Sequence, residues 1–496
     1  MTPVLMGVDI GTSSTKGCLT DATGRVLRQA ECPHTTSMPQ PGWFEHDADA
    51  IWWDDFVTIC RELLPAGGAV PSAVCVSGIG PCLLPTRADG SPLRPAILYG
   101  IDTRASQEID DLNRILGAEA VLARGGSPLT SQAIGPKLLW LHHREPSVWQ
   151  DCRRFFMASS YVVHRLTGAY VLDHHSASQC NPLYDLQGQS WAGDWAELIA
   201  PGLELPRLCS PLETAGQVTA SAAATTGLPA GTPVMAGTID AWAEAVSVEV
   251  REPGDLMVMY GTTMFLVQVA AAAQPSTHLW LTRGVLPDQL TVAAGMATSG
   301  ALTAWFRDLT GQGFDALFEA AAAVPPGAAG LLALPYFAGE RTPLFDPWAR
   351  GVIAGLTLAH GRGHVLRALL EATAFGVRHN LEAMEEVAGR PSRVAAVGGG
   401  TKGEVWLQIV SDVTGMDQDV HRESVGASYG DAWMAAVGLG SIGQTEAWNP
   451  VVTTVRADAV RHEAYDSLYG LYRRLYVQTA DIVHELARDW PTAQQA

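Results

Sequence analysis

The sequence has little charge for its length, and the smaller part of that charge is positive. Only 17% of its 496 residues are Asp, Glu, Lys or Arg, and 32 basic against 51 acidic residues leave a formal net charge of −19. A surface with this excess of negative charge repels a phosphate backbone, so we expect no nucleic-acid partner. A small phosphorylated ligand is compatible with it, because a few backbone N–H groups can hold one phosphate.

Several patterns that define protein classes are also missing. The eight cysteines form no C-x-x-C pair, which favours reduced thiols and a cytoplasmic protein over a disulfide framework. None of the 14 histidines stands in H-E-x-x-H, which disfavours a zinc site. The sequence has no G-x-x-x-x-G-K-[ST], so a P-loop enzyme is disfavoured too. The first 14 residues contain no Lys or Arg, unlike a secretory signal.

Uninterrupted hydrophobic runs long enough to cross a membrane are missing as well. Residues 214–239 are uncharged but rich in Gly, Pro, Ser and Thr. Residues 256–282 are uncharged too, but a polar turn at 260–263 interrupts them. We therefore expect buried strands and turns in both segments, and no membrane partner.

What the chain does contain is apolar sequence, 47% of its residues, arranged twice in the same order. A strand at 4–10, a turn and a return strand at 16–20 open the chain. Residues 255–267 repeat this order of strand, Gly-Thr turn and strand. Helical spacing alternates with strands in both halves, which predicts an α/β fold. We place the boundary near Ser247, giving domains 1–246 and 247–496 with a ligand cleft between them.

The turn after the first strand carries the strongest chemical signal, Asp9-Ile10-Gly11-Thr12-Ser13-Ser14-Thr15-Lys16. Gly11 lets the backbone approach a ligand closely, and the following N–H groups and hydroxyls can surround phosphate oxygens. Asp9 is a hard oxygen ligand that could hold Mg²⁺ through water. The alternative is a plain hairpin capped by an aspartate. The second Gly-Thr turn, 261–263, favours a pair of phosphate turns.

A second glycine-rich segment, 398–403, matches G-x-G-x-x-G between a strand and a helix, with acidic residues about 20 positions later. This is the pattern of a dinucleotide-binding loop. The same geometry can instead seat an adenosine or a phosphate at a helix N-terminus. The sequence leaves both interpretations open.

Two further acidic positions are candidates for acceptor chemistry. Asp240 is the first charge after a long uncharged run, where a carboxylate could accept a proton from a hydroxyl. Taken alone, the local sequence favours the other interpretation, the cap of the helix that begins at Ala241. Asp102 and Arg104 follow a predicted strand and could bind sugar hydroxyls or form a loop ion pair.

Several motifs resemble those of the FGGY carbohydrate kinases, in the same order along the chain. They are the opening at 9–16, a P-G-W-x-E-x-D segment at 41–47, a G-E-R-T-P region at 338–343, a C-terminal signature at 351–371 and an adenosine-side motif at 398–412. The G-E-R-T-P region is similar to that of the xylulokinases.

The resemblance implies two ribonuclease-H-like domains, as in actin and hexokinase, around a central cleft that closes on ATP. It implies that Asp240 is the catalytic base and that Asp9 lies near Mg²⁺. The expected nucleotide ligands are Gly11, Thr12, Ser13, Lys16, Gly261, Thr262, Gly399, Gly400 and Glu404. Many relatives are dimers, so a homodimer is possible.

One departure from the xylulokinases concerns the acceptor. Where they carry Q-M-H after Ser-Gly, this chain has Ile79-Gly80-Pro81. We assign Gly80, Pro81, Asp102, Arg104 and Asp240 to the substrate side. The main hypothesis is ATP-dependent phosphorylation of a pentulose such as xylulose or of a related ketose. The alternative acceptor is a sugar acid or polyol of the gluconate, ribulose, ribitol, glycerol or erythritol type.

Two hypotheses from other classes remain. A dinucleotide-dependent oxidoreductase would use Gly398 to Gly403, but it leaves the Asp9 turn unexplained. A non-catalytic sugar sensor of the same fold would bind sugar without forming ADP.

Overall fold

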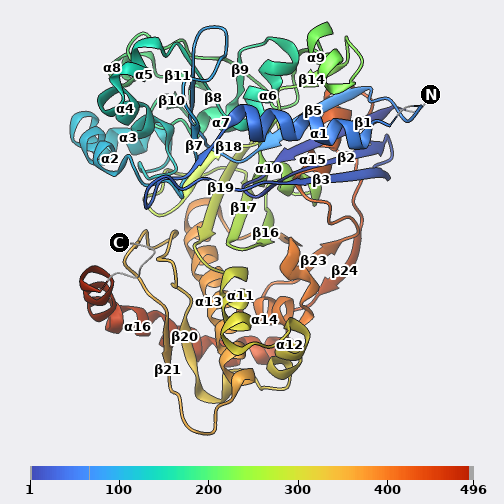
Figure 1. Ribbon diagram of the computed structural model, residues 1–496. Coiled ribbons are helices and arrows are strands. Elements are labelled where there is room, and N and C mark those ends of the chain that lie inside the picture. Colours follow the sequence, from blue (N-terminus) through green and yellow to red (C-terminus); the bar gives the residue numbers. More distant parts are fainter. Residues whose placement is uncertain (1–2, 66, 491–496) are drawn as a thin grey trace. The chain divides into compact units, whose positions relative to one another are not determined.

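The computed structural model describes residues 3–65 and 67–490 (Figure 1). The chain folds into two compact units, and both are discontinuous in sequence. Unit 1 contains Met1–Arg251, Ala273–Thr291 and Val425–Asn449, and unit 2 contains Glu252–Ala272, Val292–Ser424 and Pro450–Ala496. The single functional boundary near Ser247 stays a prediction. The division into units also shows that a late segment of the chain, Val425–Asn449, belongs with the first half.

The central sheet of unit 1 combines an antiparallel hairpin with parallel strands. Its spatial order is β13 (Thr214–Gln217), β14 (Pro233–Met235), β5 (Ala73–Gly78), β1 (Val4–Ile10), β2 (Ser14–Asp21) and β3 (Val26–Pro33), with β15 (Thr238–Ile239) beside β5. In the ladders, Asp9 lies opposite Lys16 of β2 and opposite Ser77 of β5. Since β15 runs parallel to β5, Asp240 follows β15 at the carboxyl edge of the sheet. Asp9, near the end of β1, lies at the same edge.

Helices cover both faces of this sheet. Met6, Val8 and Ile10 of β1 belong to a core that also contains residues of α1 (Asp54–Leu63) and α6 (Ala158–Thr167). The alternate residue, Gly7, faces α15 (Ala427–Gly438) on the other side. A Cβ on Gly7 would lie 1.9 Å from the Ser428 carbonyl oxygen, so glycine is what lets β1 and α15 approach this closely.

The other helices of unit 1 are η1 (Ala48–Trp53), α2 (Ser106–Leu112), η2 (Asn113–Gly117), α3 (Ala118–Gly125), α4 (Ile134–Arg144), α5 (Pro146–Asp151), α7 (His174–Ser178), α8 (Gly193–Ile199), α9 (Ala220–Thr226) and α10 (Asp240–Ser247). Its short strands are β4 (Glu45–His46), β6 (Leu84–Thr86), β7 (Ala96–Ile97), β8 (Arg154–Phe156), β9 (Val171–Asp173), β10 (Tyr184–Asp185), β11 (Ser190–Trp191), β12 (Arg207–Cys209) and β18 (Trp280–Arg283).

Unit 2 repeats the strand order of unit 1. Its sheet contains β19 (Leu290–Met296), β17 (Met264–Ala270), β16 (Asp255–Tyr260), β22 (Arg393–Val397), β23 (Gln418–His421) and β24 (Val451–Val455). The hairpin partners β16 and β17 are antiparallel, and β16 is parallel to β22. The repeat of strand, Gly-Thr turn and strand is thus confirmed.

The helices of unit 2 are α11 (Gly300–Thr310), α12 (Phe314–Ala322), η3 (Ala328–Gly330), α13 (Arg362–Ala388), η4 (Gly399–Lys402), α14 (Glu404–Thr414) and α16 (Ala459–Asp489), and β20 (Leu332–Leu334) pairs with β21 (Val352–Ala354). Among residues 3–65 and 67–490, no helix combines the length and the apolar character that a bilayer crossing needs. Residues 214–239 form the expected strands, but also the short helix α9.

Candidate active site

The β1–β2 turn contains the first group of predicted phosphate ligands. The Gly11 N–H donates to the Ser14 carbonyl at 2.9 Å and closes the turn. A Cβ on Gly11 would lie 2.7 Å from that oxygen, which explains the glycine. Thr12 and Ser13 are the next residues of the turn, and the Thr12 hydroxyl lies 3.2 Å from the Tyr99 hydroxyl. The structure therefore brings these ligands together, and their contact with phosphate stays a prediction.

An acidic group surrounds the end of β1. Burial raises the pKa of Asp9 well above its usual range, and the negative charges of Asp240 and Glu244 raise it further. The positive charge of Lys16 and the Ser77 hydroxyl, 3.4 Å from Asp9 Oδ1, act in the opposite direction. The effects of Asp240 and Glu244 on the pKa of Asp9 indicate that both carboxyl groups lie within electrostatic reach of Asp9.

Asp240 is the first residue of α10 and directly follows β15. Its Oδ1 accepts a hydrogen bond from the Ala241 N–H at 2.7 Å, which fixes the side chain at the start of the helix. Burial raises the pKa of Asp240 to about 6, against that hydrogen bond. The helix-start interpretation is correct as geometry, although the cap itself is Ile239. Such a position remains compatible with a catalytic base.

Two acidic residues of this region were not assigned to the site from the sequence. Burial, and then the charge of Asp240, raise the pKa of Glu244 to about 7, and the Ala427 N–H at the start of α15 donates to its carboxylate. Asp431 of α15 accepts hydrogen bonds from the Ser77 hydroxyl at 2.6 Å and the Ser77 N–H at 3.2 Å. A signal existed for Asp431, because it is the one charge in the otherwise apolar or small residues 427–438.

The acidic group fits a magnesium ion that is shared with a nucleotide. Among residues 3–65 and 67–490, no three His, Cys, Asp or Glu side chains converge into a metal cage. Mg²⁺ usually takes only one or two carboxylates, with phosphate oxygens and water as the other ligands. Asp240 and Glu244 raise the pKa of Asp9, Asp240 raises that of Glu244, and Lys16 is the cation that acts against both effects, so a divalent cation would relieve the remaining repulsion.

Gly80 and Pro81, two predicted substrate residues, follow β5 and are buried. A Cβ on Gly80 would lie 2.6 Å from Ile239 Cγ1, so the Gly80 backbone packs against the residue that precedes Asp240. The Gln132 amide donates to the Gly80 carbonyl at 3.3 Å. The structure thus brings Gly80 next to the Asp240 segment, and contact with a substrate stays a prediction.

Asp102 and Arg104 form an ion pair in which both side chains are 0% exposed. The Arg104 guanidinium donates to Asp102 from Nε and Nη2, and to Glu45 from Nη1 at 2.8 Å. Its Cζ lies 4.2 Å from the centre of the Trp43 ring. Asp102 also accepts from the Phe44 N–H at 2.7 Å. Since all three guanidinium nitrogens are engaged, the geometry favours the ion-pair alternative over sugar binding.

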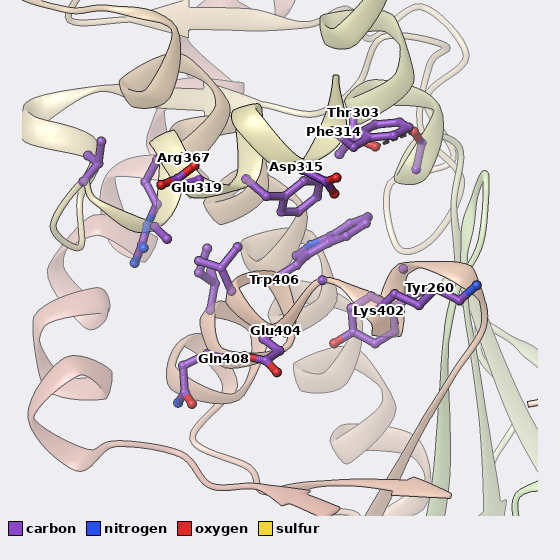
Figure 2. A pocket seen from close by; sticks show the side chains of 18 of the residues that line it. Tyr260, Thr303, Phe314, Asp315, Glu319, Arg367, Lys402, Glu404, Trp406 and Gln408 are labelled. Atoms are coloured by element: carbon purple, nitrogen blue, oxygen red, sulfur yellow. Dashed lines mark hydrogen bonds between the residues drawn. The ribbon is translucent and has the colours of Figure 1, made fainter. Parts of the chain in front are cut away.

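A cavity of about 1450 Å³ lies within unit 2. Its lining includes all of the nucleotide ligands predicted in this unit, Gly261, Thr262, Gly399, Gly400 and Glu404. Figure 2 shows Glu404 and Gln408 of α14 on one side of it, and Phe314 and Asp315 at the beginning of α12 on another. The start of α14 faces the cavity, and a helix N-terminus stabilises negative charge.

The glycine-rich loop enters this cavity as one turn of 3₁₀ helix between β22 and α14. A Cβ on Gly400 would lie 2.8 Å from Tyr260 Cβ and 3.0 Å from the Trp406 ring. A Cβ on Gly399 would meet nothing within 4 Å. The loop therefore needs glycine at position 400 to approach β16, while position 399 is free of steric constraint.

The second Gly-Thr turn is held by the beginning of α11. The Gly300 N–H donates to the Gly261 carbonyl at 2.9 Å, and the Ser299 and Ala301 N–H groups donate to the Thr262 carbonyl at 3.2 and 3.0 Å. These contacts fix the direction of the turn at the cavity wall. Gly261 and Thr262 are thereby brought to the same cavity as the glycine-rich loop.

Other lining residues are absent from the sequence-based prediction. They include Phe314 and Phe318 of α12, Arg367 of α13 and Arg461 of α16. Both arginines are paired, Arg367 with Glu371 at 2.7 Å and Arg461 with Asp412 at 2.6 Å. The sequence contains a signal only for the two phenylalanines, through their i, i+4 spacing, and that spacing usually marks the core-facing side of a helix.

Comparisons with known proteins agree along most of the chain. Residues 4–247 match the model of the N-terminal domain of the FGGY family of carbohydrate kinases, and residues 256–439 match that of its C-terminal domain. A xylulose kinase of Staphylococcus epidermidis is 27% identical over 500 residues, which cover 97% of this chain and 98% of that protein. A glycerol kinase of Nocardia farcinica is 32% identical over 461 residues, covering 87% and 89%. The crystal structure of the xylulose kinase from Rhodospirillum rubrum matches with a TM-score of 0.89 and 33% identity, over 97% of this chain and 100% of that one.

Proposed function

Since the chain belongs to the FGGY family of carbohydrate kinases, and is therefore a phosphotransferase, we propose that it transfers the γ-phosphoryl group of ATP to a hydroxyl of a pentulose such as xylulose. The expected α/β fold with two ribonuclease-H-like domains is confirmed by the family match and by the solved relative. The oxidoreductase hypothesis is set aside, because residues 398–403 lie within the matched kinase domain.

The observation that carries the proposal is the position of Asp240 beside Asp9, at the carboxyl edge of the unit 1 sheet. Burial raises the pKa of Asp240 to about 6. A carboxyl group with this pKa is mostly ionised at neutral pH, yet it is a stronger base than an ordinary aspartate. This is the property required to accept a proton from a sugar hydroxyl as that hydroxyl attacks phosphorus.

The other residues would bind and orient the phosphates. In the proposal, the N–H groups and hydroxyls of Thr12 and Ser13 contact phosphate oxygens, as do those of Thr262. The cavity in unit 2 holds the adenosine, with Gly399, Gly400 and Glu404 in its wall. Bound Mg²⁺, held through water by Asp9, would neutralise charge on the transferring group.

Two observations bear on the acceptor. Xylulose kinases are among the most similar relatives and solved structures, which favours a pentulose. A glycerol kinase is 32% identical, and Gly80-Pro81 stands where the xylulokinases have Met-His, so a polyol is the second candidate. The proposal places the reaction in the cytoplasm, where ATP is supplied.

The test is a screen for ADP release from Mg·ATP with pentuloses, hexuloses, aldonates and polyols, using the Asp240→Asn variant as the blank. We expect the highest kcat/KM with a pentulose. A polyol or aldonate as the best acceptor would correct the substrate and leave the kinase assignment intact. Sugar binding without ADP release from any acceptor would contradict the proposal and support the sensor hypothesis.

A further inference from the structure

The segment that follows β3 holds every carbonyl group of the Gly11–Thr12–Ser13 turn. The His34 ring Nε2 lies 3.1 Å from the Gly11 carbonyl oxygen. The Thr36 hydroxyl donates to the Thr12 carbonyl at 2.9 Å, and the His34 N–H donates to the Ser13 carbonyl at 2.9 Å. Three successive peptide groups are thereby held from the same segment.

This arrangement determines where the N–H groups of the turn point. In a trans peptide the C=O and the next N–H point in opposite directions. Because segment 34–36 holds the three carbonyls, the N–H groups of Thr12 and Ser13 are directed away from that segment. Neither N–H has an acceptor among residues 3–65 and 67–490. Successive free N–H groups with a common direction form an anion site.

A chain of hydrogen bonds connects Thr36 to the core. The Trp52 indole N–H lies 3.2 Å from His46 Nδ1, which makes that nitrogen an acceptor. The His46 proton is then on Nε2, 3.0 Å from the Thr36 hydroxyl oxygen. The Thr36 hydroxyl in turn donates its hydrogen bond to the Thr12 carbonyl. Burial, and then the positive charge of His34, lower the pKa of His46 to about 4, in agreement with a neutral ring.

His34 has the opposite requirement, because both of its ring nitrogens face acceptors. Nδ1 lies 2.7 Å from Asp55 Oδ2, and Nε2 faces the Gly11 carbonyl. The Thr15 hydroxyl and the Cys32 thiol also donate to the Asp55 carboxylate, which keeps it an acceptor. A ring that donates from both nitrogens carries two protons and a positive charge.

We propose that His34 and His46, the latter through Thr36, are positioning residues that aim the Gly11–Ser13 turn at a nucleotide phosphate, with His34 charged and His46 neutral. This inference rests on the proposed function, because it assumes that the turn binds phosphate. It adds the residues that hold the turn in its binding conformation, and none of them touches the nucleotide itself.

The first test is a matched pair at Thr36, in the full-length chain. Thr36→Val keeps the shape of the side chain and removes the hydroxyl, while Thr36→Ser restores the hydroxyl. Calorimetry with Mg·AMP-PNP should give about tenfold weaker binding for Thr36→Val and less than about twofold change for Thr36→Ser. Adenosine, which lacks phosphates, should bind all three proteins equally. Equal AMP-PNP affinity for both variants, or a matching loss of adenosine affinity, would overturn the proposal.

The second test reads the protonation states directly. In protein with ¹⁵N-labelled histidine, we expect His34 to show two protonated ring nitrogens and His46 only one. His34→Gln retains a single donor and no charge, so it identifies the His34 signals by their disappearance. A singly protonated His34 at neutral pH would contradict the proposal.

The third readout is the AMP-PNP affinity of His34→Gln. The groups that face His34 are Asp55 from α1, Cys32 from β3 and His46 from β4. Because His34→Gln cannot donate to both Asp55 and the Gly11 carbonyl, it should bind Mg·AMP-PNP more weakly than the parent and bind adenosine equally well. AMP-PNP affinity equal to that of the parent would count against His34. A protein that binds AMP-PNP but phosphorylates no sugar would contradict the proposed function and leave the inference on His34 and His46 intact.

Discussion

Glu244 lies one helical turn after Asp240 on α10, so the two carboxyl groups share one face of that helix. Burial raises the pKa of both, to about 6 for Asp240 and about 7 for Glu244, and the charge of Asp240 adds to the rise at Glu244. The same two charges raise the pKa of Asp9. When Asp240, Glu244 and Asp9 are ionised, their negative charges repel one another. This repulsion favours both the uptake of a proton and the binding of a cation.

Replacing Asp240 with asparagine should remove most of the turnover. The amide of the new side chain cannot accept a proton, and general base catalysis typically contributes about 10²- to 10⁴-fold to the rate. We expect a fall of that size in kcat for the best acceptor, with Mg·AMP-PNP affinity within about twofold of the parent. Asp194→Asn, which alters an ion pair with Arg124 and whose own side chain is 63% exposed, serves as the control. Turnover within a few-fold of the parent would show that Asp240 is not the base.

The pH dependence of kcat/KM should show an acidic limb near pH 6. Asp240 works as a base only when it is ionised, so activity falls as pH drops through its raised pKa of about 6. Glu244, with a pKa of about 7, is still mostly protonated at pH 6 and carries little charge there, so Glu244→Gln should leave this limb in place. The measurement is kcat/KM from pH 5 to 9 for both proteins. A limb that moves to lower pH in Glu244→Gln would mean that Glu244 ionises before Asp240, which would contradict this order of ionisation.

Local sequence was enough to predict much of the framework. The strand predicted at 4–10 forms as β1, and the strand, turn and strand predicted at 255–267 form as β16 and β17, because these are short buried strands delimited by turn residues. The glycines of the two hairpin turns also follow from local geometry. The alternation of helices with strands predicted for both halves is also present. These are features that a few neighbouring residues determine.

The parts that were not predicted depend on distant residues. Val425–Asn449 belongs to unit 1 because β1 and α15 pack through Gly7, more than 400 residues earlier in the chain. From the sequence, Glu244 is an ordinary acidic residue in the first turn of a helix. Its place in the site depends on α15, whose Ala427 N–H donates to its carboxylate. Arg104 looked equally suited to a sugar or an ion pair, and only its contacts with Glu45 and Trp43 distinguish the two. No local pattern carries such information.

Glu340 should make stability decrease with pH. Its side chain is 6% exposed, its Oε1 accepts from the Ala297 and Arg341 N–H groups, and burial raises its pKa to about 8. Between its unfolded and folded pKa the folded state binds more protons, so the free energy of unfolding falls as pH rises through this window. The loss is on the order of 5 kcal/mol above pH 8. In Glu340→Gln the neutral side chain removes this dependence.

The measurement for Glu340 is the melting temperature of the parent and of Glu340→Gln from pH 5 to 9. The variant should gain on the parent steadily as pH rises, whatever its absolute stability. Glu463→Gln, at an exposed position of α16, should follow the parent throughout. A constant offset between parent and Glu340→Gln would mean that Glu340 has no raised pKa.

The cavity in unit 2 can be tested with two adjacent glycines. Alanine at 400 would bring a methyl group within 2.8 Å of Tyr260 Cβ and 3.0 Å of the Trp406 ring, whereas alanine at 399 would meet nothing within 4 Å. Overpacking of this kind costs about 1–3 kcal/mol, so Gly400→Ala should shift the loop and weaken ADP binding about tenfold. Gly399→Ala is the matched control and should retain parental affinity.

Calorimetry with ADP and with adenosine should give the same loss for Gly400→Ala, because the proposal places the adenosine half of the nucleotide against this loop. A loss for ADP alone would instead place the phosphates there, and equal affinities in both variants would move the nucleotide away from the loop.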